Sequence, residues 1–253
     1  ASARNTGISN AKGKYIAFLD DDDEWDREKI QKQISLYEEL DRKYAVVYCG
    51  MKIWSNNSVS INSPSIRGNL KNKIIADELY TIPSSCVFNR NILLNIGGYD
   101  LDLKTGIDHD LWMKIAKNEY FVDYVDEALV KHISSNMPQM TTDVSVRIVG
   151  IEKYLDKWRP TIIEWFGRHK GEKYCLDYYT NVIGGLGFSL IKKGDVLTGR
   201  KILWDVFLKN PKKFILKPEF LLVMVAGKAG YIVGRIINSG LKKLSSFSLI
   251  TAK

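Results

Sequence analysis

The sequence predicts an α/β fold with a mixed sheet over residues 1–140, followed by an all-α region. Short apolar runs of strand length alternate with helical patterns in the first part. Beyond residue 140 these runs stop, and apolar residues recur at helical spacing. The chain has 253 residues, of which 45% are hydrophobic, so it can bury a sizeable core.

The α/β part begins with a short helix over residues 3–13, which Gly13 is expected to end. The apolar run 15–19 follows at once and is predicted to form a strand. The later elements expected from the pattern are strands at 44–48, 86–89 and 122–125 and helices at 91–96 and 110–118.

Residues 27–39 are predicted to form a helix that covers the sheet. Ile30, Ile34 and Tyr37 lie at helical spacing, and charged residues stand between them. We therefore expect these three side chains to pack against the strands.

Four consecutive carboxylates, Asp20 to Asp23, follow the apolar run 15–19. Adjacent like charges repel one another and lose solvation on burial, so a site that keeps them holds a cation or faces water. Ligands of open α/β sheets bind beyond the carboxyl ends of strands, which is where these side chains are expected. Oxygen ligands favour Mg²⁺ or Mn²⁺. The alternative is a solvated acidic loop.

The residues around this acidic run carry a family resemblance. The chain reads Ala-Arg-Asn-x-Gly from Ala3, and then Ala-x-Gly-x-Tyr-Ile-Ala-Phe-Leu-Asp-x-Asp-Asp-x-Trp from Ala11. Further matches in order are Pro83-Ser84-Ser85, Gly97-Gly98-Tyr99-Asp100 and Gly106-Ile107-Asp108-His109-Asp110-Leu111-Trp112. Residues 1–135 thus resemble a family 2 glycosyltransferase of the GT-A fold.

The resemblance implies an enzyme that moves a sugar from a nucleotide-sugar donor to a hydroxyl of a glycan, a polysaccharide or a lipid-linked acceptor. It implies Mn²⁺ or Mg²⁺ as cofactor and inversion at the anomeric carbon. Members of the family begin with a nucleotide-binding β-α-β segment, and this sequence starts after it. We therefore expect a GT-A sheet that lacks this first segment, and an incomplete nucleotide pocket.

The resemblance also assigns roles to single residues. Asp20 and Asp22 match the two ends of the family's Asp-x-Asp motif and are expected to bind the metal. Asp108 matches the general base, although the family has Glu-Asp where this chain has Ile107-Asp108. Alternatively, Asp108 or Asp110 only caps the helix that follows. The expected substrate-binding residues are Arg4, Asn5, Asp20, Asp21, Ser85, Gly97, Gly98 and Asp110.

His132 follows the last predicted strand, near the place where relatives carry an Arg or His that closes over the diphosphate. The sequence around it does not match that pattern cleanly. His132 is therefore left out of the predicted site.

Two other function classes stay open. A nucleotidyltransferase would share the fold and the use of a metal, but it should show a Gly-rich, basic phosphate loop near its N-terminus. A non-catalytic, membrane-associated binding module would keep the fold without the chemistry. Binding of nucleotide-sugars in the presence of Mn²⁺ distinguishes the enzyme from this module.

Residues 141–215 are predicted to form a helical region that contains a helical hairpin. Helices at 174–193 and 196–209 flank Gly194-Asp195, where Gly suits a helix end and Asp the next helix start. A last segment, 216–253, is expected to contain a helix from Pro218. Its basic side chains lie near one helical face, at Lys217, Lys228, Arg235 and Lys242.

Charge and cysteines suggest where the protein acts. Residues 1–150 hold 18 Lys and Arg against 21 Asp and Glu, whereas residues 151–253 hold 19 against 8. The basic half carries no nucleic-acid motif, so we expect it to contact an anionic membrane instead. Three widely spaced cysteines argue against a disulfide framework. A cytoplasmic protein, peripheral on the cytoplasmic face of the membrane, fits these observations.

Overall fold

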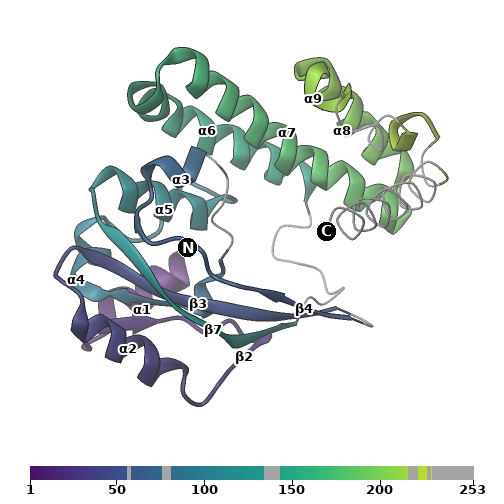
Figure 1. Cartoon of the computed structure of the whole chain (residues 1–253). Coiled ribbons are helices and arrows are strands. Elements are labelled where there is room, and N and C mark those ends of the chain that lie inside the picture. Colours follow the sequence, from purple (N-terminus) through teal and green to yellow (C-terminus); the bar gives the residue numbers. More distant parts are fainter. Residues whose placement is uncertain (56–57, 76–80, 134–142, 216–221, 227–228, 230–253) are drawn as a thin grey trace, which may run out of the picture. The chain divides into compact units, whose positions relative to one another are not determined.

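The computed structural model describes residues 1–55, 58–75, 81–133, 143–215, 222–226 and 229 (Figure 1). The chain divides into two compact units, Ala1–Tyr154 and Leu155–Lys253. The predicted boundary near residue 140 falls outside the described residues and stays a prediction, as do the limits proposed for segment 216–253.

The first unit is built on one mixed sheet with the strand order β1-β6-β3-β7-β2. The long strands β3 (Tyr44–Ser55) and β7 (Phe121–Ile133) run parallel, whereas β1–β6, β3–β6 and β2–β7 pair antiparallel. The shorter strands on this path are β1 (Tyr15–Ala17), β2 (Asp23–Trp25) and β6 (Cys86–Asn89). The predicted mixed α/β sheet is confirmed.

The small elements fill the connections between these strands. They are β4 (Ser58–Asn62), which pairs with β3, β5 (Gly68–Asn69), which pairs with β7, α3 (Lys71–Ile75), the 3-10 turn η1 (Pro83–Ser85), α4 (Arg90–Asn95) and α5 (Ile107–Lys117). The two last helices lie within a few residues of their predicted positions.

The first helix, α1 (Ser2–Asn10), ends earlier than predicted. Ala11 is extended, with φ −63° and ψ 137°, so Gly13 is not the residue that ends the helix. The chain has to enter the sheet here: Lys14 accepts the N–H of Arg90, and Tyr15 opposes Asn89 across β1 and β6. Pairing with a distant strand therefore overrides the local glycine signal.

The helix α2 (Lys29–Glu39) covers the sheet through two of the three predicted residues, because Tyr37 is buried with Val47 and Val87 and Ile34 packs against them. Its buried residues are Lys29, Gln33 and Tyr37, whereas Ile30 is 37% exposed. Gln33 can be buried because its Nε2 donates to the carbonyls of Val47 and Ser85, both at 2.9 Å. The expected packing of Ile30 is thus wrong, and the polar residues Lys29 and Gln33 are buried on this helix instead.

The second unit is helical. Its described helices include α7 (Arg168–Lys193), α8 (Val196–Lys209) and α9 (Pro211–Ile215), and α6 (Val144–Phe166) leads into it from the first unit. Gly194 ends α7 in the left-handed region at φ 108°, and the side chain of Asp195 accepts the N–H of Thr198 at the start of α8. The predicted hairpin is confirmed.

The four basic residues predicted to form a stripe in the last segment lie outside the described residues. None of the helices in the described part of the chain is long and apolar enough to cross a lipid bilayer.

Candidate active site

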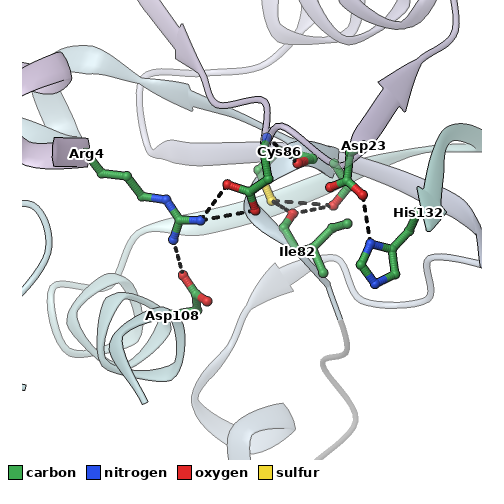
Figure 2. A network of polar contacts seen from close by, with 9 residues as sticks. Arg4, Asp23, Ile82, Cys86, Asp108 and His132 are labelled. Carbon is green, nitrogen blue, oxygen red and sulfur yellow. Dashed lines mark hydrogen bonds and ion pairs between the residues drawn. The ribbon is translucent and has the colours of Figure 1, made fainter. Parts of the chain in front are cut away.

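Arg4 joins two carboxylates that are far apart in the sequence (Figure 2). Its guanidinium donates to Asp20 at 2.8 and 3.2 Å and to Asp108 at 3.1 Å. Arg4 comes from the first turn of α1, Asp20 follows β1, and Asp108 is in the first turn of α5. The structure thus brings together three residues that the sequence analysis assigned separately to donor, metal and base.

Arg4 is held in place by aromatic rings as well as by its ion pairs. Its Cζ lies 5.3 Å from the ring centroid of Tyr99 and 6.0 Å from that of Phe18. The Arg4 side chain is 19% exposed, against 39% for Asp20 and 41% for Asp108. The two carboxylates therefore keep an open side on which a ligand can bind.

The surroundings of Asp108 make it a stronger base than an ordinary aspartate. Burial raises the pKa of the Asp108 carboxyl, and the charges of Arg4 and His109 lower it by less. Asp108 lines a narrow recess whose other walls are largely apolar, including Phe88, Tyr99 and Trp112. This apolar wall explains why the charged carboxylate is disfavoured despite its accessible edge.

The four carboxylates of the acidic run are not equivalent. Asp20 faces Arg4, and Asp21 and Asp22 are exposed. Asp23 is buried at the start of β2, opposite His132 on β7, and its Oδ1 lies 2.7 Å from the His132 Nδ1. Figure 2 shows this pair beside the Arg4 network. His132 therefore belongs to the same neighbourhood, although the sequence around it did not indicate this.

A chain of hydrogen bonds supports the loop that carries Asp20. The Asp20 N–H donates to Ser84 Oγ at 3.1 Å, and the Trp25 Nε1 donates to the Ser84 carbonyl at 2.7 Å. The Nζ of Lys29 lies 4.2 Å from the Trp25 ring centroid. The Lys29 side chain is fully buried, and this burial lowers its pKa. The acidic run is thus fixed at both ends, through Ser84 and through β2.

Ser85 and Asp110, both predicted to bind substrate, are completely buried. The Ser85 hydroxyl donates to the carbonyl of Ile82 at 2.7 Å. Asp110 forms an ion pair with Lys114 at 3.4 Å, and Lys114 also donates to the Gly98 carbonyl at 2.8 Å. Contact of Ser85 and Asp110 with substrate stays a prediction. In the structure these two side chains stabilise the walls of the site.

Asn5 and the two glycines predicted to bind substrate meet at one turn. Asn5 Nδ2 donates to the Tyr99 carbonyl at 2.7 Å, and the Tyr99 N–H donates to Asn5 Oδ1 at 2.9 Å. Gly97 and Gly98 both have positive φ, at 76° and 55°. The paired bonds fasten α1, and with it Arg4, to the turn that presents Tyr99.

Gly98→Ala is expected to cost more stability than Gly97→Ala. Both substitutions place an alanine at positive φ, which costs about 1–2 kcal/mol. Only at Gly98 would the new Cβ clash, because it would lie 2.7 Å from Asn5 Oδ1, whereas nothing lies within 4 Å of it at Gly97. The lost Asn5–Tyr99 bonds add about 1 kcal/mol or more. Urea unfolding of both variants measures the difference; equal midpoints would contradict the role given to Asn5.

The described residues contain no group of three or more His, Cys, Asp or Glu side chains placed to hold a metal ion. Mg²⁺ and Mn²⁺ in phosphate-transfer sites often take only one or two carboxylates, because substrate phosphates and water supply the other ligands. Asp22 is an exposed carboxylate next to the Arg4 network and meets that requirement. The residues present therefore fit a metal that arrives with a diphosphate.

Comparison with known proteins finds similarity to glycosyltransferases. Residues 1–97 match the model of Glycosyl transferase family 2. An uncharacterized glycosyltransferase of Rickettsia prowazekii is 30% identical over 164 residues, which cover 62% of this chain and 50% of the relative. The chain thus spans half the length of that relative.

Two further matches extend the comparison. WfgD of Escherichia coli, a UDP-Glc:alpha-D-GlcNAc-diphosphoundecaprenol beta-1,3-glucosyltransferase, is 42% identical over 59 residues, which cover 23% of this chain and 22% of WfgD. The structure of S. aureus TarS 1–349 in complex with UDP-GlcNAc superposes with a TM-score of 0.52 at 17% identity, over 91% of this chain and 68% of that one.

These matches confirm the expected fold, because the mixed sheet followed by helices is shared with TarS. The sequence match covers α1, the acidic run and the turn that ends at Gly97, which carry Arg4 and Asp20. Residues 1–97 of this chain are thus similar to the family 2 glycosyltransferases.

Proposed function

We propose that the protein transfers a sugar from a nucleotide-sugar donor to a hydroxyl acceptor, with Asp108 as the general base. The observation that carries the proposal is the Arg4 bridge, which sets Asp20 and Asp108 on either side of one guanidinium. A donor diphosphate and an acceptor hydroxyl have to meet at such a point, between a cation and a base.

Asp108 takes the proton of the acceptor hydroxyl as its oxygen attacks the anomeric carbon. The new bond joins acceptor oxygen to that carbon, the bond to the diphosphate breaks, and the diphosphate leaves with the electron pair. One displacement of this kind inverts the configuration. The raised pKa of Asp108 suits it to the step, because a base whose pKa lies closer to the working pH accepts a proton more readily.

Arg4 and the acidic run bind the donor. The guanidinium has donors to spare for a diphosphate, and its planar fork matches phosphate oxygens. Mn²⁺ or Mg²⁺, held by Asp22 and by Asp20 when Arg4 turns to the diphosphate, would neutralise the charge that develops on the leaving group. Asp21, on the same exposed loop, is left to contact the sugar or ribose hydroxyls.

The matched proteins suggest the kinds of donor and acceptor. TarS was crystallised with UDP-GlcNAc, and the name of WfgD gives UDP-Glc as donor and a diphosphoundecaprenol-linked sugar as acceptor. We therefore propose a UDP-sugar donor and a lipid-linked or polysaccharide acceptor. The reaction would then take place at the cytoplasmic face of a membrane.

The proposal is tested with a panel of UDP-, GDP- and CDP-sugars, by calorimetric binding and by release of nucleoside diphosphate, with Mn²⁺ and with EDTA. We expect a UDP-sugar to bind and turn over with Mn²⁺, and Asp22→Asn to lose the metal dependence. Binding of no nucleotide-sugar would overturn the proposal in favour of the binding module. Release of pyrophosphate from a nucleoside triphosphate and a sugar phosphate would favour a nucleotidyltransferase.

A further inference from the structure

One face of the sheet in the first unit exposes large apolar side chains next to one another. Trp54, Val59, Ile61 and Ile133 are 45%, 50%, 67% and 36% exposed. They come from β3, β4 and the end of β7, three strands that are neighbours in the sheet (Figure 1). We call these four residues, together with Lys52 and Lys131, the outer face.

The strand register places all six side chains on the same side. Trp54 opposes Val59 and Lys52 opposes Ile61 between β3 and β4, while Lys52 opposes Lys131 and Trp54 opposes Ile133 between β3 and β7. Directly opposed residues share a face, and residues two apart along a strand do so as well. Met51 and Val130, one position away on the same strands, are buried on the other side.

The charges of the outer face have one sign in excess. Lys131 lies 2.9 Å from Glu24 on β2, and its Nζ is 5.3 Å from the Trp54 ring centroid. Lys52 is exposed and has no ion-pair partner among the described residues. An apolar surface with a tryptophan at its centre and lysines around it is thus left facing away from the core.

This combination selects among possible occupants. A sugar chain would stack on Trp54 but would lay its hydroxyls on Val59 and Ile61, which cannot bond them. A second copy related by a two-fold axis would bring the lysines of both copies onto one surface, where like charges repel. Anionic headgroups complement the lysines, and the interface below them accepts the tryptophan and the aliphatic side chains.

We propose that the outer face is a membrane-contact surface, which inserts Trp54 and Ile61 into the headgroup region of an anionic bilayer. This inference rests on the proposed function in one respect: a lipid-linked acceptor would require the enzyme to work at a bilayer. Glu24, which pairs with Lys131 of the outer face, follows Asp23 directly, so the outer face begins beside the acidic run. None of the residues of the outer face belongs to the basic segment 216–253.

The test uses the whole chain and vesicles of phosphatidylcholine, alone or mixed with phosphatidylglycerol. We expect the wild type to sediment with the mixed vesicles, and the double variant Trp54→Thr and Ile61→Thr to bind about tenfold less, because two partly buried apolar side chains are lost. Lys52→Gln should weaken binding to the anionic vesicles alone. Leu101→Ser is the matched control, because it changes an apolar side chain that is 57% exposed outside the outer face. This variant should bind as the wild type does.

A second readout reports insertion itself. Trp54→Phe keeps the apolar surface and should still bind the vesicles. Lipids brominated in their acyl chains quench inserted tryptophans, so this variant should show less quenching of tryptophan fluorescence than the wild type. The inference is overturned if the double variant binds as the wild type does, or if no vesicle binds. It is also overturned if light scattering shows a wild-type dimer that the double variant dissociates, since the occupant is then a second copy.

These outcomes are separate from those of the proposed function. Trp54 and Ile61 lie outside the catalytic machinery, so the double variant should release nucleoside diphosphate from the donor in solution at the wild-type rate. Vesicle binding without donor turnover would leave the membrane surface standing and overturn the transferase. Donor turnover without vesicle binding would support the transferase and overturn the membrane-contact surface.

Discussion

We expect Asp108→Asn to lower donor turnover by about 10²–10⁴-fold, the usual effect of removing a general base. Asparagine keeps the shape of the side chain and can still accept the Arg4 hydrogen bond that Asp108 accepts at 3.1 Å. Donor affinity should therefore change little, and the loss should fall on kcat. Release of nucleoside diphosphate, measured beside calorimetric donor binding, separates the two quantities.

Asp102→Asn is the matched control, because Asp102 is an exposed aspartate shortly before α5. This variant should turn over the donor at the wild-type rate. If Asp108→Asn keeps full activity, Asp108 acts only at the start of the helix. Gly106 is the N-cap of α5 and no side chain caps this helix, so the structural role left to Asp108 is its favourable negative charge in the first turn. Losing that charge costs about 0.3–1 kcal/mol, which the unfolding midpoint measures, whereas a catalytic residue can be replaced without such a loss.

We expect Arg4→Ala to lower kcat/KM by about 10²–10³-fold, as for the loss of a cationic hydrogen-bond donor aimed at developing charge. It also moves the acid limb of the pH–rate profile to higher pH. Arg4 lowers the pKa of Asp108 against the effect of burial, so its removal raises that pKa further. A base works only when it is deprotonated. As the pH is lowered, the variant should therefore lose activity at a higher pH than the wild type does.

Two comparisons sharpen this prediction. Arg4→Lys keeps one charge but cannot reach Asp20 and Asp108 together through a planar fork, so it should recover only part of the activity. Arg67→Ala removes an arginine that is 59% exposed and pairs with Asp123, and it should leave both rate and profile unchanged. An unshifted acid limb in Arg4→Ala would show that Arg4 does not act on Asp108.

The elements whose signals are local could be predicted from the sequence. The hairpin at Gly194-Asp195 needs only a left-handed glycine and a capping aspartate, and both are neighbours in the chain. The family motif likewise singled out Arg4, Asp20 and Asp108, because each stands in a short recognisable string. Their chemical types also suggested a cation, a metal ligand and a base.

The tertiary structure decided which of these groups meet. Periodicity placed Ile30 in the core, but Lys29 and Gln33 are buried instead. Gln33 can be buried because it bonds the carbonyls of Val47 on β3 and Ser85 in η1, which lie 14 and 52 positions further along the chain. The acidic run looked uniform, yet one member pairs with Arg4 and another with His132. The register of β2 against β7 sets the second pair, and α1 packing against the Tyr99 turn sets the first.

The sequence by itself determined a glycosyltransferase-like α/β sheet and the residue types of its site. The structure alone determined that one guanidinium joins Asp20 to Asp108 and that an apolar, basic sheet face begins beside the acidic run. Side-chain type and local backbone preference are properties of short segments, whereas ion pairs and exposed faces depend on strand register between residues that can be more than 100 positions apart.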